Sequence, residues 1–149
     1  MKTSLIITTY NKPEALGKVL EGIGEQSHMP DEILVADDGS GPDTLKKIHE
    51  FSKVFRCRFD HIWQEDQGFR AARIRNRAIA KATGEYIILL DGDCIPPRRF
   101  IEDHLVLAEE SFFSREKDSR GQRTFTRFFV YRRKLDLETS EGPYIPRYF

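Results

Sequence analysis

The segment GEYIILLDGD, residues 84–93, joins a short apolar run to two carboxylates. Residues Tyr86 to Leu90 are apolar on both faces, which is typical of a strand buried in the middle of a parallel sheet. The two acids that follow are therefore expected at the carboxyl edge of the sheet, where open α/β folds bind ligands. Carboxylates together with phosphate oxygens hold Mg²⁺ or Mn²⁺, and Gly92 allows a turn tight enough for Asp91 and Asp93 to face one ion. The segment favours a metal–diphosphate site, with an acidic turn that caps the next helix as the alternative.

The composition indicates a single α/β domain. The chain has 149 residues, and its 24 Lys and Arg residues balance 24 Asp and Glu residues, so no overall field attracts nucleic acid. The two cysteines, Cys57 and Cys94, lack the spacing of a metal site or a disulfide framework. No apolar run reaches the ~20 residues of a membrane span, and the first residues do not read as a signal peptide. We expect a cytoplasmic location, with peripheral contact at the inner membrane face as the alternative.

Strand-like and helix-like patterns alternate along the chain. Short apolar and β-branched runs predict four strands, at Leu5–Thr9, Glu32–Ala36, Phe59–Gln64 and Tyr86–Leu90. Each run is followed by an amphipathic helical pattern. Four β-α units in succession predict a doubly wound, mostly parallel sheet with flanking helices and right-handed crossovers.

Several single residues carry more local predictions. Asn11 and Ser40 have the spacing of helix N-caps, each followed by an early proline and an acid. Gly84 is expected to end the third helix as a C-cap. Leu45 and Trp63 are expected to face the core.

Each predicted strand leads into a polar cluster at the same edge of the sheet. The clusters are Tyr10-Asn11, Asp37-Asp38, Glu65-Asp66-Gln67 and Asp91-Gly92-Asp93. Loops at the carboxyl ends of parallel strands lie side by side, so these clusters are predicted to converge on one crevice. The carboxylates there would repel one another and a phosphate, so cations are needed to offset them.

The predicted helix at residues 70–83 supplies candidate cations. It carries Arg70, Arg73, Arg75 and Arg77. Arg73 and Arg77 share a face at i, i+4 whereas Arg75 points elsewhere, so only one or two of the four are expected to reach a ligand. A solvated helix face that pairs with nearby acids is the alternative.

Four motifs in this order resemble the motif set of the family 2 glycosyltransferases with the GT-A fold. They are Thr8-Thr9-Tyr10-Asn11, Asp37-Asp38-Gly39-Ser40, Gly68 followed by Ala72-Arg73-Ile74-Arg75-Asn76, and Leu90-Asp91-Gly92-Asp93. The resemblance covers about residues 4–108 and implies a Rossmann-like nucleotide-diphospho-sugar transferase fold. It further implies a nucleotide-diphosphate sugar donor, most often a UDP-sugar, Mg²⁺ or Mn²⁺ as cofactor, and inverting transfer of the sugar to a glycan or lipid-linked acceptor.

The resemblance also implies roles for single residues. Thr9 and Tyr10 would line the nucleoside pocket, and Asn11 would be a further donor-binding residue. Asp38 or its neighbour Asp37 would bond the base, and Arg75 would lie near the nucleotide. Asp91 would face the ribose or sugar, and Asp93, with Asp91 beside it, would hold the metal. A carboxylate accepts the imide N–H of a uracil, and a metal on the diphosphate stabilises the charge of the leaving group, so elementary chemistry agrees with these roles.

The end of the chain departs from the family pattern. Residues 1–109 correspond to a donor-binding domain, whereas 110–149 form a basic, aromatic-rich extension in place of a long acceptor-binding half. A strand is predicted from the aromatic residues between Phe125 and Tyr131. The acids Asp136, Glu138 and Glu141 have no recognisable catalytic position, so no general base is identified.

This departure leaves alternatives open. The chain could be a nucleotide-sugar binding module or a truncated fragment without transferase activity, completed by a second copy or a partner chain. On that expectation it binds donor by itself and transfers sugar slowly or not at all. Haloacid-dehalogenase phosphatases place Asp-x-Asp on their first strand, followed by Thr or Val, whereas here it ends the fourth strand before Cys94-Ile95. No G-x-G-x-x-G follows the first strand, which argues against a dinucleotide oxidoreductase.

Overall fold

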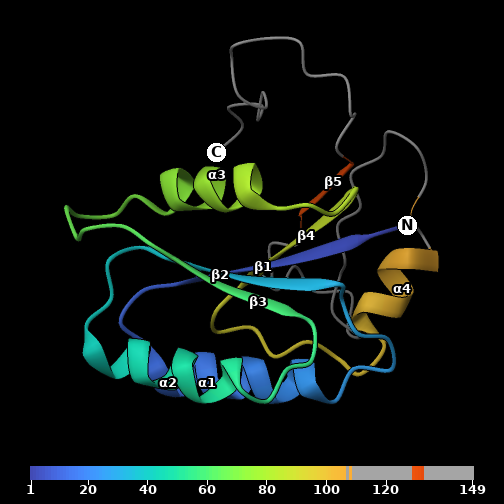
Figure 1. The fold of residues 1–149 in the computed structure, drawn as a ribbon, viewed down its shortest axis with the longest axis horizontal. Helices are drawn as coiled ribbons and strands as arrows, with labels where there is room; N and C mark the ends of the chain where they lie inside the picture. The colour runs from blue at the N-terminus through green and yellow to red at the C-terminus, as the bar shows by residue number, and fades with distance from the viewer. Residues whose placement is uncertain (107, 109–128, 133–149) are drawn as a thin grey trace, which may run out of the picture.

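The computed structural model of the chain describes residues 1–106, 108 and 129–132 (Figure 1). Strands and helices alternate in the predicted order. They are β1 (Thr3–Thr9), α1 (Pro13–Gly24), β2 (Glu32–Asp37), α2 (Pro42–Ser52), β3 (Arg58–Trp63), α3 (Ala71–Lys81), β4 (Tyr86–Asp91), α4 (Phe100–Val106) and β5 (Phe129–Arg132). Within the described residues no helix combines the length and apolar character needed to cross a membrane.

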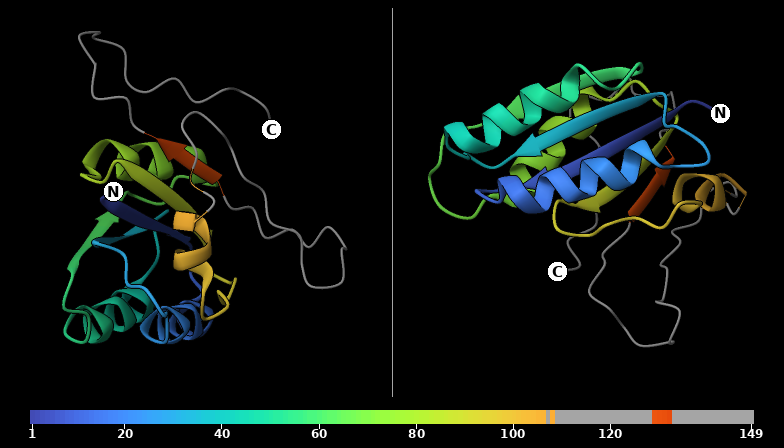
Figure 2. Two further views of the ribbon diagram at one scale, coloured as in Figure 1. Left: turned by 90° about the vertical axis from the view of Figure 1, so that its right-hand side faces the viewer. Right: turned by 90° about the horizontal axis from the view of Figure 1, so that it is seen from below.

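The sheet confirms the predicted doubly wound architecture. Its order is β3-β2-β1-β4-β5, and neighbouring strands among the first four are parallel. β5 pairs antiparallel with β4 and includes part of the aromatic segment predicted as a strand, whereas Phe125 and Phe128 lie outside the described residues. Helices α1 and α2 cover one face of the sheet and α3 covers the other (Figures 1 and 2).

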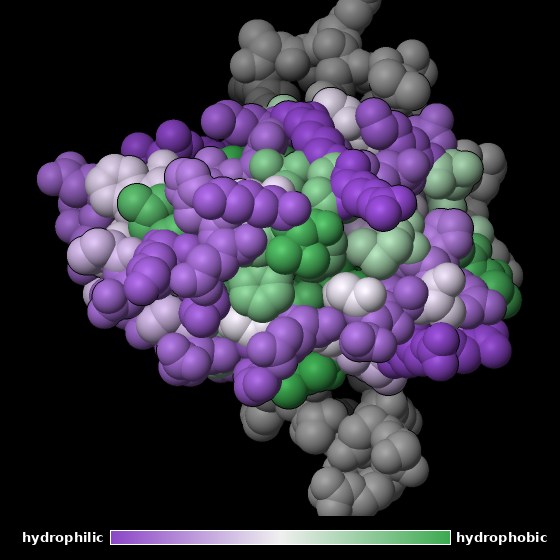
Figure 3. Space-filling model, turned by 60° about the horizontal axis from the view of Figure 1, so that its bottom comes forward, coloured by the Kyte–Doolittle hydropathy of each residue, from purple (hydrophilic) through white to green (hydrophobic). Residues whose placement is uncertain are grey.

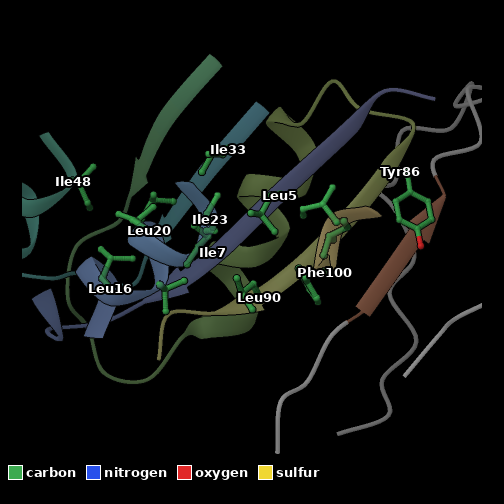
Figure 4. Close-up of a cluster of buried hydrophobic side chains, with 14 residues drawn as sticks. Leu5, Ile7, Leu16, Leu20, Ile23, Ile33, Ile48, Tyr86, Leu90 and Phe100 are labelled. Atoms are coloured by element: carbon green, nitrogen blue, oxygen red, sulfur yellow. The ribbon is translucent and has the colours of Figure 1, made fainter. Parts of the chain in front are cut away.

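Apolar side chains fill both faces of the central strands. On the face covered by α1 and α2, the buried cluster includes Leu5 and Ile7 of β1 with residues of both helices (Figure 4). On the α3 face, Ile6 of β1 packs in a second cluster with Ile74 and Ala78 of α3. Burial on two faces explains why these strands read as continuous apolar runs rather than as alternating patterns.

The predicted helix caps are wrong. The N-cap residues of α1 and α2 are Lys12 and Gly41, and neither helix has a side-chain cap hydrogen bond. The C-cap of α3 is Ala82 rather than Gly84. Gly84 instead lies against β1, where its N–H donates to Ser4 Oγ at 2.9 Å and a Cβ would meet the Ser4 backbone nitrogen at 2.7 Å. The glycine is therefore required by close packing rather than by a helix end.

Two residues predicted for the core lie at the surface. Leu45 of α2 is 47% exposed, and Trp63 is 48% exposed at the end of β3, which is the last strand on its side of the described sheet. Both line an open pocket of about 440 Å³ together with Pro42 and His61. The face that carries α1 and α2 has an apolar area at its centre within a hydrophilic rim (Figure 3).

Candidate functional site

Backbone hydrogen bonds hold the loops at the carboxyl edge of the sheet together. The N–H of Asp38 donates to Thr9 O at 3.0 Å, and the N–H of Gln64 donates to Asp37 O at 3.3 Å. On the other side of β1, the N–H of Gly92 donates to Thr8 O at 2.7 Å. The four polar clusters at the ends of β1 to β4 therefore lie side by side along one edge of the sheet.

Asn11 fastens the first loop to the second. Its N–H donates to Ser40 Oγ at 2.9 Å, and its Oδ1 accepts the N–H of Gly41 at 2.9 Å. These two contacts occupy the side chains of Ser40 and Asn11, which were expected to cap α2 and α1. Asn11 also adopts φ of 46°, a left-handed conformation that asparagine tolerates better than most residues. The role of Asn11 in this structure is to fix the loop that carries Tyr10 and Lys12.

Asp37 faces the interior of the protein. Its side chain is buried, with Oδ1 accepting the N–H of Ser40 at 2.8 Å and Oδ2 lying 2.9 Å from His61 Nε2. Burial alone would raise the pKa of Asp37, but the hydrogen bonds from His61 and Ser40 outweigh it and lower the pKa. Both oxygens of Asp37 thus contact other residues of the protein. Of the two acids predicted to bond a base, Asp37 is therefore the one whose contacts hold the fold together.

Asp38 is the centre of a buried polar cluster. Its Oδ2 accepts the N–H of Arg70 at 2.7 Å, and its Oδ1 accepts a hydrogen bond from Gln64 Nε2. Three buried polar atoms of residues bonded to Asp38 have no hydrogen-bond partner within the described part of the chain: Thr9 Oγ1, Gln64 Oε1 and Arg70 Nε. A buried polar group without a partner costs free energy, so this cluster is suited to a ligand that offers both donors and acceptors.

Arg75 and Asp91 form a half-buried ion pair on the α3 side of the edge. Arg75 donates from Nη2 to Asp91 Oδ1 at 2.8 Å and from Nε to Thr8 Oγ1 at 2.9 Å. The helix therefore directs Arg75 into the site, contrary to the expectation from helical spacing that it points elsewhere. Arg77 donates to the backbone oxygen of Trp63 at 3.2 Å, and Arg73 is exposed. The arginine that the family resemblance singled out is the one that contacts the Asp-Gly-Asp turn.

Gly92 gives the Asp-Gly-Asp turn its shape. A Cβ at this position would lie 2.6 Å from the Thr8 backbone oxygen, so a larger residue would push β4 away from β1. The turn leaves Asp93 at the surface, where its Oδ2 lies 2.9 Å from Lys12 Nζ with side-chain exposures of 51% and 61%. The hydrogen bond from Lys12 is the main cause of the lowered pKa of Asp93.

Tyr10 lies at the mouth of the crevice. Its ring is 47% exposed, and its hydroxyl donates to Asp66 Oδ2 at 2.8 Å, which raises the pKa of Tyr10. The same carboxylate accepts the N–H of Gly68 at 3.1 Å. Gly39, with φ of 100°, packs so closely on Asp66 that a Cβ would lie 2.6 Å from the Asp66 Cα. The aromatic ring is therefore held in place by the loop after β3.

Each aspartate at this edge already has a partner in the protein. Asp37 pairs with His61, Asp91 with Arg75 and Asp93 with Lys12, while Asp38 accepts two N–H donors. Arg75 and Lys12 therefore offset the charges of Asp91 and Asp93 before any ligand binds, whereas Asp37 and Asp38 are held by hydrogen bonds.

The edge fits a metal only as part of a complex with a ligand. In residues 1–106 and 108 no group of three or more His, Cys, Asp or Glu side chains could hold an ion by itself. Asp93 offers an exposed carboxylate, and Asp91 has one oxygen committed to Arg75. One or two carboxylates completed by phosphate oxygens and water are a common site for Mg²⁺, so the residues present are compatible with such an ion.

Three residues of the site were not predicted from the sequence. Lys12 contacts Asp93 from 81 positions away, and no local spacing signals that pair. His61 was not considered because it lies within a predicted strand. Gln64 was predicted only as the last residue of that strand, although a polar residue at a strand end beside the site is a signal that could have identified it. Asp136, Glu138 and Glu141 lie outside the described residues.

The chain is similar in sequence to curated relatives over about two thirds of its length. Over 103 residues the chain is 32% identical to the hyaluronan synthase of Pasteurella multocida, covering 68% of this chain and 10% of that protein. The chain spans between 10% and 33% of the length of the first curated relatives that it matches.

Solved structures have the same fold. The structure of S. aureus TarS residues 1–349 in complex with UDP matches with a TM-score of 0.61 and 25% identity, covering 71% of this chain and 31% of that chain. The Pyrobaculum calidifontis mannosyltransferase PcManGT in complex with GDP-Man and Mn²⁺ matches with a TM-score of 0.64 and 25% identity, covering 75% and 34%. The family model described as glycosyl transferase family 2 matches residues 4–143. The chain therefore belongs to glycosyl transferase family 2, and its described residues have the GT-A fold of that family.

Proposed function

We propose that the carboxyl edge of this sheet binds a nucleotide-diphosphate sugar, with UDP as the nucleotide. The protein would then transfer the sugar, with inversion, to a glycan or lipid-linked acceptor. On this proposal residues 1–109 form the donor-binding domain, and residues 110–149 belong to the acceptor side.

The main support for this proposal is the buried polar cluster around Asp38. The cluster has acceptors in the Asp38 carboxylate and Gln64 Oε1 and a donor in Arg70 Nε, with a hydroxyl at Thr9 that can act as either. A uracil presents an imide N–H between two carbonyl oxygens, which is the complementary combination of one donor and two acceptors. Tyr10 supplies an exposed aromatic ring beside this cluster, which can stack on the base.

The diphosphate would lie toward the Asp-Gly-Asp turn. Arg75 and Lys12 bring positive charge to this part of the edge, and the N-terminus of α1 adds the positive end of a helix dipole. A divalent ion held by Asp93 and Asp91 would supply further positive charge to the leaving diphosphate. Arg75 keeps Asp91 oriented in either case, because it bonds both Asp91 and Thr8.

The relatives are consistent with this proposal in different ways. The TarS structure contains UDP, whereas the PcManGT structure contains GDP-Man and Mn²⁺. The fold thus serves more than one nucleotide, and the choice of UDP here depends on the polar cluster around Asp38.

Isothermal titration of nucleoside diphosphates in the presence of Mn²⁺ tests the proposal. The most informative variant is Thr9→Val, because the Thr9 hydroxyl has no partner among the described residues and its removal should not destabilise the fold. We expect Thr9→Val to lose about 1 kcal/mol of UDP binding, or roughly fivefold in affinity. Inorganic pyrophosphate, which has no base, should bind both proteins equally.

Thr9→Ser is the matched control. It retains the hydroxyl and should bind UDP with nearly the affinity of the unmodified protein. If UDP binds no better than pyrophosphate, or if Thr9→Val and Thr9→Ser lose UDP affinity equally, base recognition at this cluster is wrong. Firm UDP binding without sugar transfer to any acceptor would instead favour a nucleotide-sugar binding module.

A further inference from the structure

Lys12 differs from the other basic partners of the aspartates in its freedom to move. Arg75 is half-buried and makes two hydrogen bonds, and His61 is largely covered and bonded to a buried carboxylate. Among the described residues the Lys12 ammonium group makes one ion pair, with Asp93, and both side chains are mostly exposed. An exposed ion pair of this kind contributes only ~0.2–1 kcal/mol, so it can exchange partners readily.

The backbone of Lys12, in contrast, is fixed. Asn11 anchors the preceding residue to Ser40 and Gly41, and the Lys12 carbonyl accepts the N–H of Leu16 at 3.0 Å as the first bond of α1. Lys12 is also the N-cap residue of that helix. A flexible ammonium group is thus tethered at a defined point beside the Asp-Gly-Asp turn.

The position of the ammonium group creates a competition. Lys12 Nζ lies 2.9 Å from Asp93 Oδ2, and Asp93 is the more exposed of the two carboxylates of the Asp-Gly-Asp turn. The ammonium group and the ion cannot share that oxygen at close range, because like charges repel. An ion that binds Asp93 through Oδ2 must therefore move Lys12, and a diphosphate bound at the same edge offers the displaced ammonium group a new anionic partner.

We propose that Lys12 is a tethered counter-ion that occupies Asp93 in the empty site and moves to the diphosphate when a divalent metal takes Asp93. Metal and diphosphate would then bind cooperatively, since each ligand removes a cost that the other would otherwise meet. This inference rests on the proposed donor site but requires only its diphosphate part. Lys12 would act as a positioning residue for the two ligands.

Binding of Mn²⁺, followed by the electron paramagnetic resonance signal of the free ion, tests the proposal on the full chain. Without diphosphate, Lys12→Met should bind Mn²⁺ about two- to fivefold more tightly than the unmodified protein, because the competing ammonium is gone. With inorganic pyrophosphate, whose own binding of Mn²⁺ is measured in a protein-free titration and subtracted, the unmodified protein should gain at least about fivefold in Mn²⁺ affinity. Lys12→Met should keep only the part of that gain that comes from direct coordination of the ion by pyrophosphate oxygens.

Lys18→Met is the matched control, since Lys18 is also exposed on α1 and pairs with Glu21 at 2.8 Å, away from the site. It should behave like the unmodified protein in both measurements. The proposal is overturned if Lys12→Met binds Mn²⁺ alone no more tightly than Lys18→Met, or if both variants keep the same cooperativity. If the protein does not bind UDP but still binds Mn²⁺ and pyrophosphate cooperatively, the role of Lys12 is supported and the nucleotide proposal is refuted.

Discussion

Glu32 provides a stringent test of how the sheet is held together at the edge opposite the site. Its buried carboxylate accepts hydrogen bonds from Ser4 Oγ, from the N–H and hydroxyl of Thr83, and from the N–H of Gly84, and it pairs with Arg58 at 2.7 Å. One side chain thus joins β1, β2, β3 and the segment between α3 and β4. We expect Glu32→Gln to destabilise the protein strongly.

The expected loss follows from the geometry of the two oxygens. In Glu32→Gln the remaining oxygen can keep the three donors on Oε1, but as a neutral acceptor, which weakens each bond by about 1 kcal/mol. The new amide N–H₂ replaces Oε2, where the Thr83 hydroxyl can turn to accept a hydrogen bond instead of donating one. The amide also faces Arg58, a donor, and that lost pair adds at most about 1 kcal/mol because Arg58 is 43% exposed. The total is about 3–4 kcal/mol, a large part of a typical stability of about 5–15 kcal/mol.

Urea denaturation followed by circular dichroism measures this loss. With a slope of about 1–3 kcal/mol per molar urea, the midpoint should fall by about 1 M or more. Asp60→Asn is the control, because Asp60 is an exposed partner of the same Arg58 and its removal should cost less than about 1 kcal/mol. Equal losses for Glu32→Gln and Asp60→Asn would refute the reasoning.

The pH dependence provides a second check. Burial would raise the pKa of Glu32, but the hydrogen bonds from Ser4, Thr83 and Gly84 outweigh it and lower the pKa below the ordinary 4.5. A lowered carboxyl pKa contributes stability that is present above the unfolded value and is lost as the pH falls through the folded value. The stability difference between the unmodified protein and Glu32→Gln should therefore shrink below about pH 4.5.

Two further predictions concern a glycine and a histidine. Gly92→Ala should destabilise the protein by about 1–3 kcal/mol, because its Cβ would meet Thr8 O at 2.6 Å, whereas Gly24→Ala, with open space around it in α1, should be neutral or stabilising in the same thermal melt. Burial lowers the pKa of His104 to about 4, so the unfolded chain binds a proton that the folded protein excludes between about pH 6.5 and 4. Stability should therefore fall with decreasing pH across that range by up to about 1.4 kcal/mol per unit, and His104→Gln should have a flatter profile.

The sequence was sufficient to predict the strands because their signal is local. β1, β2 and β4 are short, largely apolar runs that end in polar clusters, and pairing among parallel strands follows from the alternation with helices. The predictions that failed depended on partners far away in the chain. Asn11 was expected to cap its own helix but bonds Gly41, 30 residues away. Trp63 was expected in the core because it is apolar, but the strand order that puts β3 at the edge is a property of the whole sheet.

The motifs indicated which residues meet at the carboxyl edge of the sheet but not how they pair. Thr9, Asp38, Arg75 and Asp93 lie at that edge as expected, and their roles in binding stay predictions, yet no motif indicates that Lys12 pairs with Asp93. Such pairs are set by the angle at which loops leave the sheet, and spacing along the chain carries no information about that angle.

The antiparallel pairing of β5 with β4 has a consequence for how the protein is made. β4 ends at Asp91 and β5 begins at Phe129, so β4 leaves the ribosome well before its second neighbour exists. Until then, one edge of β4, an almost entirely apolar strand, is open to other chains. An exposed strand edge of this kind promotes aggregation of incompletely synthesised polypeptides. Synthesis that stalls between these two strands should therefore favour aggregation more than a stall after Arg132, and chaperone binding should be greatest in that interval.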